Sequence, residues 1–260
     1  MTPSISQPVA LAISGTYSTG KTTTTEALSL ATGIPTIQAR SAREILFDLT
    51  PEKSFQHLDA RELLALGLRR LEERIHGEAL AASNGCFLSD GSVLNEWVYG
   101  RVRMIVGLNP GAPLLERVLR RIAGFGARRF MERYLDAYGT VVKERAKRLY
   151  TCFVHLPVEF PMDPDGHRPV SERYRTLSDT LLLDTVNELG LPCAVVRGTL
   201  SERIAAIVDH YRLPLAMPIE DAVQLARERI GASRDALHER WLATREQPSI
   251  VRRMRYASRY

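Results

Sequence analysis

The sequence predicts a three-layer α/β domain built on a five-stranded parallel sheet. Short apolar runs alternate along the chain with longer segments of helical pattern. The first run, PVALAISG, is continuously apolar and ends in glycine, as expected of a strand that is buried on both faces. The 260 residues, of which 45% are hydrophobic and 25% charged, are enough for one large domain or for a core with an appendage.

The other strands are expected in apolar runs that follow helical segments: TIQAR (36–40), CFLSD (86–90), YTCFVHLP (150–157) and CAVVRG (193–198). Helical patterns occupy 22–31, 60–82, 91–105, 113–147, 171–189 and 202–212, and two more lie between 219 and 245. In the segment 60–82, leucine and isoleucine recur at helical spacing, at Leu64, Leu68, Leu71 and Ile75. Strands that alternate with helices imply right-handed crossovers and a parallel sheet.

We divide the chain into a core of residues 1–213 and a C-terminal helical extension of residues 214–260. The core carries a helical insertion at about residues 106–149. A loop rich in Asp, Pro and Gly, at about residues 160–176, is interpreted as a lid over a ligand site.

Charge is spread unevenly over a chain whose formal net charge is +5. Residues 114–149 contain ten Lys or Arg against four acidic residues. Such a segment either meets phosphates, nucleic acid or an acidic partner, or simply solvates a helix, and the sequence leaves both readings open.

Membrane and export signals are not found in the sequence. No apolar run approaches the roughly 20 residues that span a bilayer. The opening MTPSISQPVALAIS lacks the basic and apolar regions of a signal peptide. We therefore expect a cytoplasmic protein without a membrane partner, and a homodimer is an open alternative to a monomer.

The stretch GTYSTGKT, residues 15–22, satisfies the pattern G-x-x-x-x-G-K-[ST] between a predicted strand and a predicted helix. Its glycines let successive backbone N–H groups turn toward one anion, and the helix N-terminus adds its dipole. In such a loop Lys21 reaches the β- and γ-phosphates, and the Thr22 hydroxyl binds Mg²⁺. The motif predicts binding of ATP and Mg²⁺ by Gly15, Thr16, Tyr17, Ser18, Thr19, Gly20, Lys21, Thr22 and Thr23.

Asp90 ends the third predicted strand, and the carboxyl ends of parallel strands face the ligand crevice. There Asp90 has two candidate roles, as a Mg²⁺ ligand or as the base that takes the proton of an attacking hydroxyl. The structural alternative is an N-cap for the helix that follows.

The lid segment DPDGHRPVSERYR places three arginines near a helix start: Arg168, Arg173 and Arg175. Arginines over a nucleotide neutralise charge on the transferring phosphoryl group, so Arg168 and Arg173 are candidate catalytic residues, and Arg168 also a nucleotide contact. The alternative is a solvated helix start capped by Ser171. Gly198 and Arg203, after the last predicted strand, either wrap the nucleotide base or form an ordinary turn.

These motifs together resemble a known family. GKTT, SAREI, FLSDGSVLNEWVYG, DGHRP and VVRG are similar to the small P-loop kinases and ATPases, AAA-like proteins related to nicotinamide-riboside kinase and deoxynucleoside kinase domains. The resemblance covers roughly residues 8–210 and implies a three-layer P-loop NTPase fold. In deoxynucleoside kinases the acid of an Asp-Arg-Ser motif acts as base and its arginine helps to position phosphate.

The chain departs from that motif at its second position. The matching residues are Asp90, Gly91 and Ser92, so the acid is kept and the arginine is replaced by glycine. Nearby arginines that we considered as substitutes are Arg43, Arg101 and Arg103.

The resemblance also implies an acceptor pocket lined by the segments after the second and third strands. Besides Asp90, the matching residues are Gln38, Arg40, Arg43, Glu96, Trp97, Tyr99 and Arg101. An aromatic pair with arginines suits a flat, polar or phosphorylated acceptor. Trp97 and Tyr99 are equally well interpreted as core residues of a helix.

The sequence therefore predicts a P-loop kinase, an ATP- and Mg²⁺-dependent phosphotransferase that moves the γ-phosphate to a hydroxyl of a small metabolite such as a nucleoside. The first alternative is an ATP-hydrolysing switch that acts through a macromolecular partner, which the basic segment and the C-terminal extension would suit. A nucleic-acid-associated kinase or ATPase is less favoured. The sequence contains no N/TKxD motif of the kind that reads guanine, which favours ATP over GTP.

Overall fold

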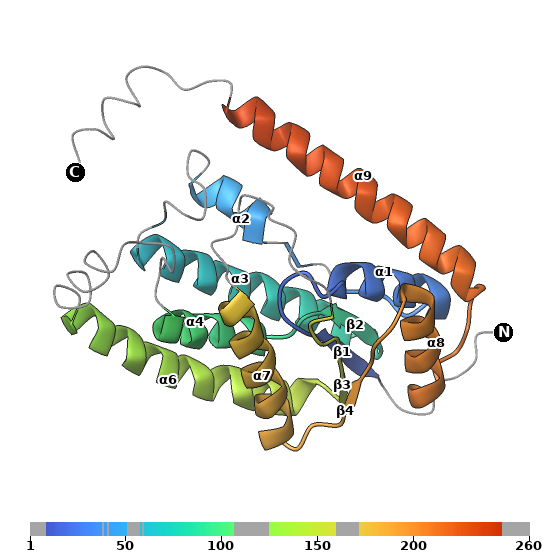
Figure 1. The fold of residues 1–260 in the computed structure, drawn as a ribbon, viewed down its shortest axis with the longest axis horizontal. Coiled ribbons are helices and arrows are strands. Elements are labelled where there is room, and N and C mark those ends of the chain that lie inside the picture. Colours follow the sequence, from blue (N-terminus) through green and yellow to red (C-terminus); the bar gives the residue numbers. More distant parts are fainter. Residues whose placement is uncertain are drawn as a thin grey trace.

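The computed structural model shows a parallel sheet with helices on both faces (Figure 1). It describes residues 9–37, 39–40, 42–50, 58, 60–106, 125–159 and 172–245. The strands of these residues are β1 (Ala10–Ser14), β2 (Phe87–Asp90), β3 (Cys152–His155) and β4 (Cys193–Val195). They lie in the order β2-β1-β3-β4 with every pairing parallel, which confirms the predicted α/β class.

The expected fifth strand at 36–40 is wrong for the described residues. Thr36 forms an isolated parallel bridge with Leu88. The N–H of Ile37 donates to the Leu88 carbonyl and the N–H of Leu88 donates to the Pro35 carbonyl, both at 2.9 Å. Pro35 has no N–H to extend the ladder, and the apolar pattern ends at Ile37. The described sheet therefore has four strands, with Thr36 at its edge beside β2.

Most helices lie where the sequence predicts them. Those of the described residues are α1 (Lys21–Thr32), α2 (Ala42–Leu49), α3 (Ala60–Ala82), α4 (Leu94–Val106), α6 (Phe125–Leu149), α7 (Glu172–Glu188), α8 (Leu200–Tyr211) and α9 (Ile219–Arg245). The first part of the helical pattern at 113–147 falls outside the described residues. Within the described ranges, no helix is long and apolar enough to cross a membrane.

The two helical patterns expected between 219 and 245 form one continuous helix, α9. Gly231 lies in its interior, and helix-forming residues on both sides carry the helix through the glycine at a cost of about 1 kcal/mol. Near its N-terminus Ala222, Val223 and Ala226 are buried. Figure 1 shows α9 running along α1. The division into a core and an extension at residue 213 stays a prediction.

Alternation along β1 explains its continuous apolar sequence. Leu11 and Ile13 pack into a core shared with α1, α8 and α9, whereas Ala10 and Ala12 face a second core shared with α4, α6 and α7. Successive residues of a strand point to opposite faces, so a strand between two helix layers has to be apolar at every position. The predicted three layers are thereby present.

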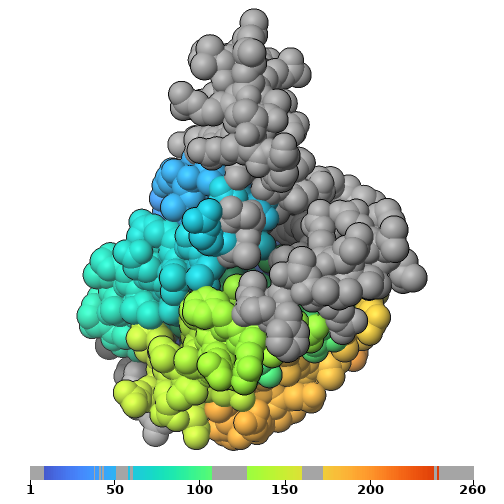
Figure 2. Space-filling model, turned by 90° about the vertical axis from the view of Figure 1, so that its left-hand side faces the viewer, coloured from blue at the N-terminus to red at the C-terminus, as the bar shows by residue number. Residues whose placement is uncertain are grey.

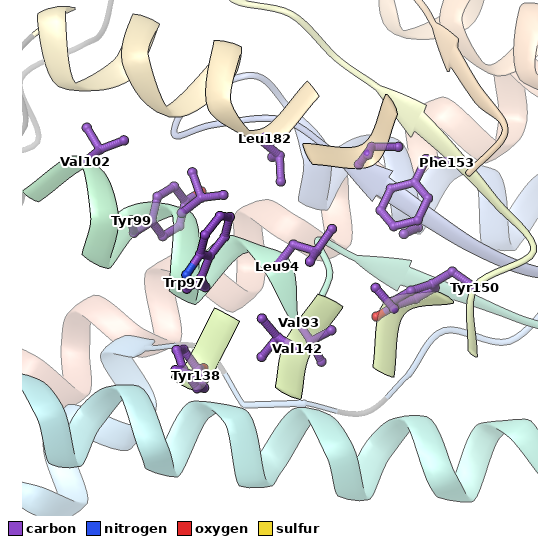
Figure 3. Close-up of a cluster of buried hydrophobic side chains, with 14 of the residues drawn as sticks. Val93, Leu94, Trp97, Tyr99, Val102, Tyr138, Val142, Tyr150, Phe153 and Leu182 are labelled. Carbon is purple, nitrogen blue, oxygen red and sulfur yellow. The ribbon is translucent and has the colours of Figure 1, made fainter. Parts of the chain in front are cut away.

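The core on the α4 side is rich in aromatic side chains (Figure 3). Trp97 is 7% exposed, and its indole Nε1 donates a hydrogen bond of 2.9 Å to the carbonyl oxygen of Leu135 on α6. The ammonium of Lys143 lies 4.9 Å from the centre of the indole ring. Trp97 thus joins α4 to α6.

Helices α3 and α6 lie side by side on the face seen in Figure 2. Arg145 of α6 donates through Nε to Glu78 Oε2 of α3 at 2.8 Å, and the Tyr150 hydroxyl donates to the other carboxylate oxygen. Glu78 is completely buried. An acid without exposure to water needs such partners, which makes this network a fixed contact between the two helices.

Two helical glycines give a matched test of this packing. A Cβ added at Gly139 of α6 would lie 2.5 Å from Trp97 Nε1, whereas one added at Gly67 of α3 meets nothing within 4 Å. We expect Gly139→Ala to lower the free energy of unfolding by about 1–3 kcal/mol through overpacking. Gly67→Ala should raise it by about 0.5–1 kcal/mol, since alanine loses less backbone entropy. Urea unfolding of both variants measures the two changes, and equal effects would contradict this account of the α4–α6 contact.

Candidate functional site

The loop between β1 and α1 has the backbone conformation that its glycines predict. Gly15 has φ 143° and Gly20 has φ 88°. A Cβ at Gly15 would lie 2.6 Å from the carbonyl oxygen of Leu156 and 2.7 Å from Thr19 Oγ1, so only glycine fits there. Gly20 precedes α1 without a side-chain cap, which leaves the N–H groups of the first helical turn directed at an anion site.

Lys21 lies over this loop. Its ammonium donates a hydrogen bond to the carbonyl oxygen of Thr16, which also accepts from Thr19 Oγ1 at 3.2 Å. The Thr16 hydroxyl is buried and makes no hydrogen bond within the described part of the chain. A buried donor of this kind fits the oxygen of a phosphate held by the loop.

The sheet brings Asp90 to the predicted nucleotide loop. Ile13 of β1 is paired with Asp90 of β2, so the two strands end at the same edge. The Thr22 hydroxyl donates a 2.6 Å hydrogen bond to Asp90 Oδ2. A hydroxyl and a carboxylate oxygen are the hard ligands that Mg²⁺ takes from proteins, with waters and substrate phosphates completing its shell. In the described ranges no group of three or more His, Cys, Asp or Glu could hold a metal alone.

Arg74 of α3, which the sequence patterns did not single out, contacts the turn that follows β2. Its guanidinium donates to Ser89 Oγ and to the Asp90 carbonyl, both at 2.8 Å, and to the Gly91 carbonyl at 3.3 Å. Gly91 has φ 78°, and a Cβ there would lie 3.1 Å from Asn95 Oδ1. The turn after β2 therefore favours glycine at position 91, and Arg74 stabilises the turn by hydrogen bonds to its carbonyls.

Of the three arginines expected as substitutes for the missing one, the two whose side chains are described, Arg101 and Arg103, make their contacts elsewhere. Arg101 pairs with Asp136 at 2.9 Å, and the guanidinium of Arg103 lies 6.0 Å from the centre of the Tyr174 ring. The side chain of Arg43 lies outside the described residues.

The residues suggested for the acceptor are only partly brought together. Tyr99 stacks on Tyr17 of the loop, with ring centres 4.5 Å apart, and Glu96 pairs with Arg70 of α3 at 2.5 Å. Burial, together with Tyr17, raises the pKa of Tyr99 well above its usual range, so its hydroxyl stays protonated. Trp97 is buried in the hydrophobic core, which agrees with its interpretation as a core residue of a helix.

Two other predicted acceptor residues are engaged in ion pairs elsewhere. Arg101 is turned to Asp136 on α6, and Arg40 pairs with Asp48 at 2.5 Å. Gln38 lies outside the described residues.

The structure describes only some of the residues predicted for the lid and for contacts with the nucleotide base. Arg168 and residues 160–171 fall outside the described part of the chain, and Arg173 is exposed on α7. Arg203 points to the nucleotide loop, where its Nη1 donates to the Thr19 carbonyl at 2.8 Å. The N–H of Gly198 donates to Glu159 Oε1 at 3.2 Å. Thr23 is half-buried in the first turn of α1.

A family model described as an AAA domain, AAA_28, matches residues 10–203, more than half of the chain. The chain belongs to the AAA_28 family. The matched residues of this AAA_28 chain begin in β1 and end in α8, so they include the loop 15–22, Asp90 and Arg203.

Among solved structures, the AAA_28 chain is similar to a deoxyadenosine kinase from M. mycoides. The form with bound dATP matches with 16% identity and a TM-score of 0.55, covering 78% of this chain and 98% of the other. The form with dCMP and a flexible dCDP matches with 14% identity and a TM-score of 0.51, with the same coverage. No curated protein matches the chain. At these identities the likeness establishes a shared fold, and it confirms the expected P-loop kinase or NTPase architecture.

Proposed function

We propose that this protein is an ATP- and Mg²⁺-dependent phosphotransferase acting on a hydroxyl of a small metabolite, a nucleoside or nucleoside-like compound. The observation that carries the proposal is the 2.6 Å contact between Thr22 Oγ1 and Asp90 Oδ2 beside the loop that Lys21 covers. The similar deoxyadenosine kinase has dATP bound, which supports nucleotide binding by this chain.

In the proposed reaction the acceptor oxygen forms a bond to the γ-phosphorus of ATP. The bond from that phosphorus to the β–γ bridging oxygen breaks, ADP leaves, and the hydroxyl proton passes to a base for which Asp90 is the candidate. Lys21 neutralises charge on the β- and γ-phosphates. Thr22 would hold Mg²⁺, which neutralises phosphate charge when bound. Asp90 would be the second ligand of the metal in the alternative in which it is not the base.

On the acceptor side we assign Glu96 and Tyr99 to the pocket, because both lie on α4, the helix that follows Asp90. The Tyr17–Tyr99 stack offers an aromatic wall, and the Glu96–Arg70 pair offers polar groups for hydroxyls. Arg173 is exposed at the start of α7 and is proposed to approach the phosphates from that helix.

The test is the rate of ADP release by the purified protein with ATP and Mg²⁺, alone and with a panel of nucleosides, sugars and amino-alcohols. Acceleration by one class, with the phosphorylated product identified by mass spectrometry, establishes the kinase and names its acceptor. Slow turnover that no small molecule accelerates overturns the proposal in favour of an ATP-hydrolysing switch with a macromolecular partner.

A further inference from the structure

The carbonyl oxygens of the nucleotide loop are bound by cationic side chains. Arg175 of α7 donates through Nε to the Tyr17 carbonyl at 2.9 Å and through Nη2 to the Ser18 carbonyl at 3.5 Å. Arg203 of α8 donates to the Thr19 carbonyl at 2.8 Å. Lys21 donates to the carbonyl of Thr16. Four successive peptide carbonyls thus accept hydrogen bonds from positively charged groups.

Because of the geometry of the peptide bond, these contacts also fix the direction of the N–H groups of the loop. In a trans peptide the C=O of one residue and the N–H of the next point in opposite directions. A cation that holds the carbonyl of residue 17, 18 or 19 therefore turns the N–H of residue 18, 19 or 20 away from itself. Those N–H groups are the ones that a loop of this kind directs at phosphate.

Both arginines are built into the core and are not solvated. Arg175 is completely buried and Arg203 is 4% exposed. Their carboxylate partners are Glu172, 3.3 Å from Arg175, and Glu159, which accepts from Arg203 Nη2. Removing a buried guanidinium costs more than its hydrogen bonds are worth, since it strands the acceptors that it served.

The loop conformation itself requires such support. Ser18, between the two carbonyls that Arg175 binds, has φ 58°, a value that residues other than glycine rarely adopt. A strained residue persists only where its surroundings fix it. Arg175 supplies that constraint from a helix more than a hundred residues away in sequence.

We propose that Arg175 and Arg203 are positioning residues that set the nucleotide loop in its phosphate-binding conformation before any ligand arrives. The proposal rests on the proposed function in that the anion is the polyphosphate of a nucleotide. Neither arginine needs to touch that anion, because each acts through the carbonyls it holds. Because the loop is already ordered before binding, the affinity is not lowered by the free-energy cost of ordering it.

The test compares Arg175→Met, Arg203→Met and the wild type for binding of ATP with Mg²⁺ and of inorganic tripolyphosphate, by calorimetry. We expect each variant to bind both ligands about 10-fold more weakly or worse. Circular dichroism and the melting temperature establish that the variants are folded. The matched control is Arg229→Met, because Arg229 also forms an ion pair with α1, at Glu26, 2.9 Å away, but lies away from the loop. This control should bind as the wild type does.

The outcomes separate the inference from the proposed function. Folded Met variants with wild-type affinity for both ligands overturn the positioning role and leave the phosphotransferase in place. A wild type that binds tripolyphosphate but not ATP defeats the proposed function and still tests the arginines with the simpler ligand. A wild type that binds neither overturns both.

If a Met variant does not fold, Arg175→Lys and Arg203→Lys keep the positive charge but lose the planar fork. Lysine has no rigid planar fork with which to fix the directions of two neighbouring carbonyls as Arg175 does. Weakened tripolyphosphate binding in folded Arg175→Lys supports the inference, and unchanged binding overturns it.

Discussion

Lys21→Ala lowers the rate of phosphoryl transfer about 100- to 1000-fold, because a positioned cation that stabilises developing charge contributes about that much to a rate. The Lys21 ammonium lies over the nucleotide loop on the Thr16 carbonyl, and alanine leaves nothing in its place to neutralise the β- and γ-phosphates. The measurement is the steady-state rate of ADP formation at saturating ATP and acceptor.

A suitable control for this variant is Lys147→Ala. Lys147 is exposed in the last turn of α6, so its removal changes the net charge equally without touching the loop. Its activity should equal that of the wild type. Normal turnover in Lys21→Ala would exclude phosphoryl transfer at this loop.

Asp90→Asn has the second large effect, a loss of about 100- to 10,000-fold in kcat, the range expected when a catalytic base is removed. Asparagine is nearly isosteric and its amide oxygen can still accept from Thr22 Oγ1, so the 2.6 Å contact and the turn held by Arg74 survive. The matched control is Asp136→Asn, an exposed carboxylate paired with Arg101.

The same variant separates the two roles that the sequence left open for Asp90. If Asp90 is the base, kcat falls while the Mg²⁺ concentration that gives half-maximal rate stays unchanged. If it organises the metal, that concentration rises and part of the rate returns at high Mg²⁺. A wild-type rate at every Mg²⁺ concentration would remove Asp90 from the chemistry.

Local sequence signals predicted much of the fold, because the local conformations that they favour are also the ones that tertiary packing stabilises. The continuous apolar run of β1 and the following G-x-x-x-x-G-K-T specify a strand, a turn and a helix start without reference to the rest of the chain. The expected helix at 60–82 has the bounds of α3. Helix α2 was not predicted, because among its described side chains only Ile45 and Leu46 are buried, too few for a clear helical period.

The candidate site was harder to predict where residues far apart in the sequence contact one another. Arg74 lies in the interior of α3 and Arg175 in the first turn of α7, where a solvated helix surface or helix start is the natural interpretation. Only packing shows that Arg175 is completely buried and that its donors meet loop carbonyls. Trp97 illustrates the opposite case, since an aromatic residue beside a predicted catalytic strand is a core residue that bonds to α6.

The left-handed turn at Gly91 bears on how relatives of this chain should be aligned. In a sequence alignment, the position after Asp90 holds Gly91 and therefore no cation. Such an alignment would indicate that the chain lacks the arginine of the motif it resembles. In space, Arg74 Nη2 lies 3.6 Å from the point where a side chain at Gly91 would begin. A cation from a neighbouring helix thus contacts this turn although the turn itself carries none. Sequence columns should therefore be supplemented by coordinates when this motif is used to sort members of the family.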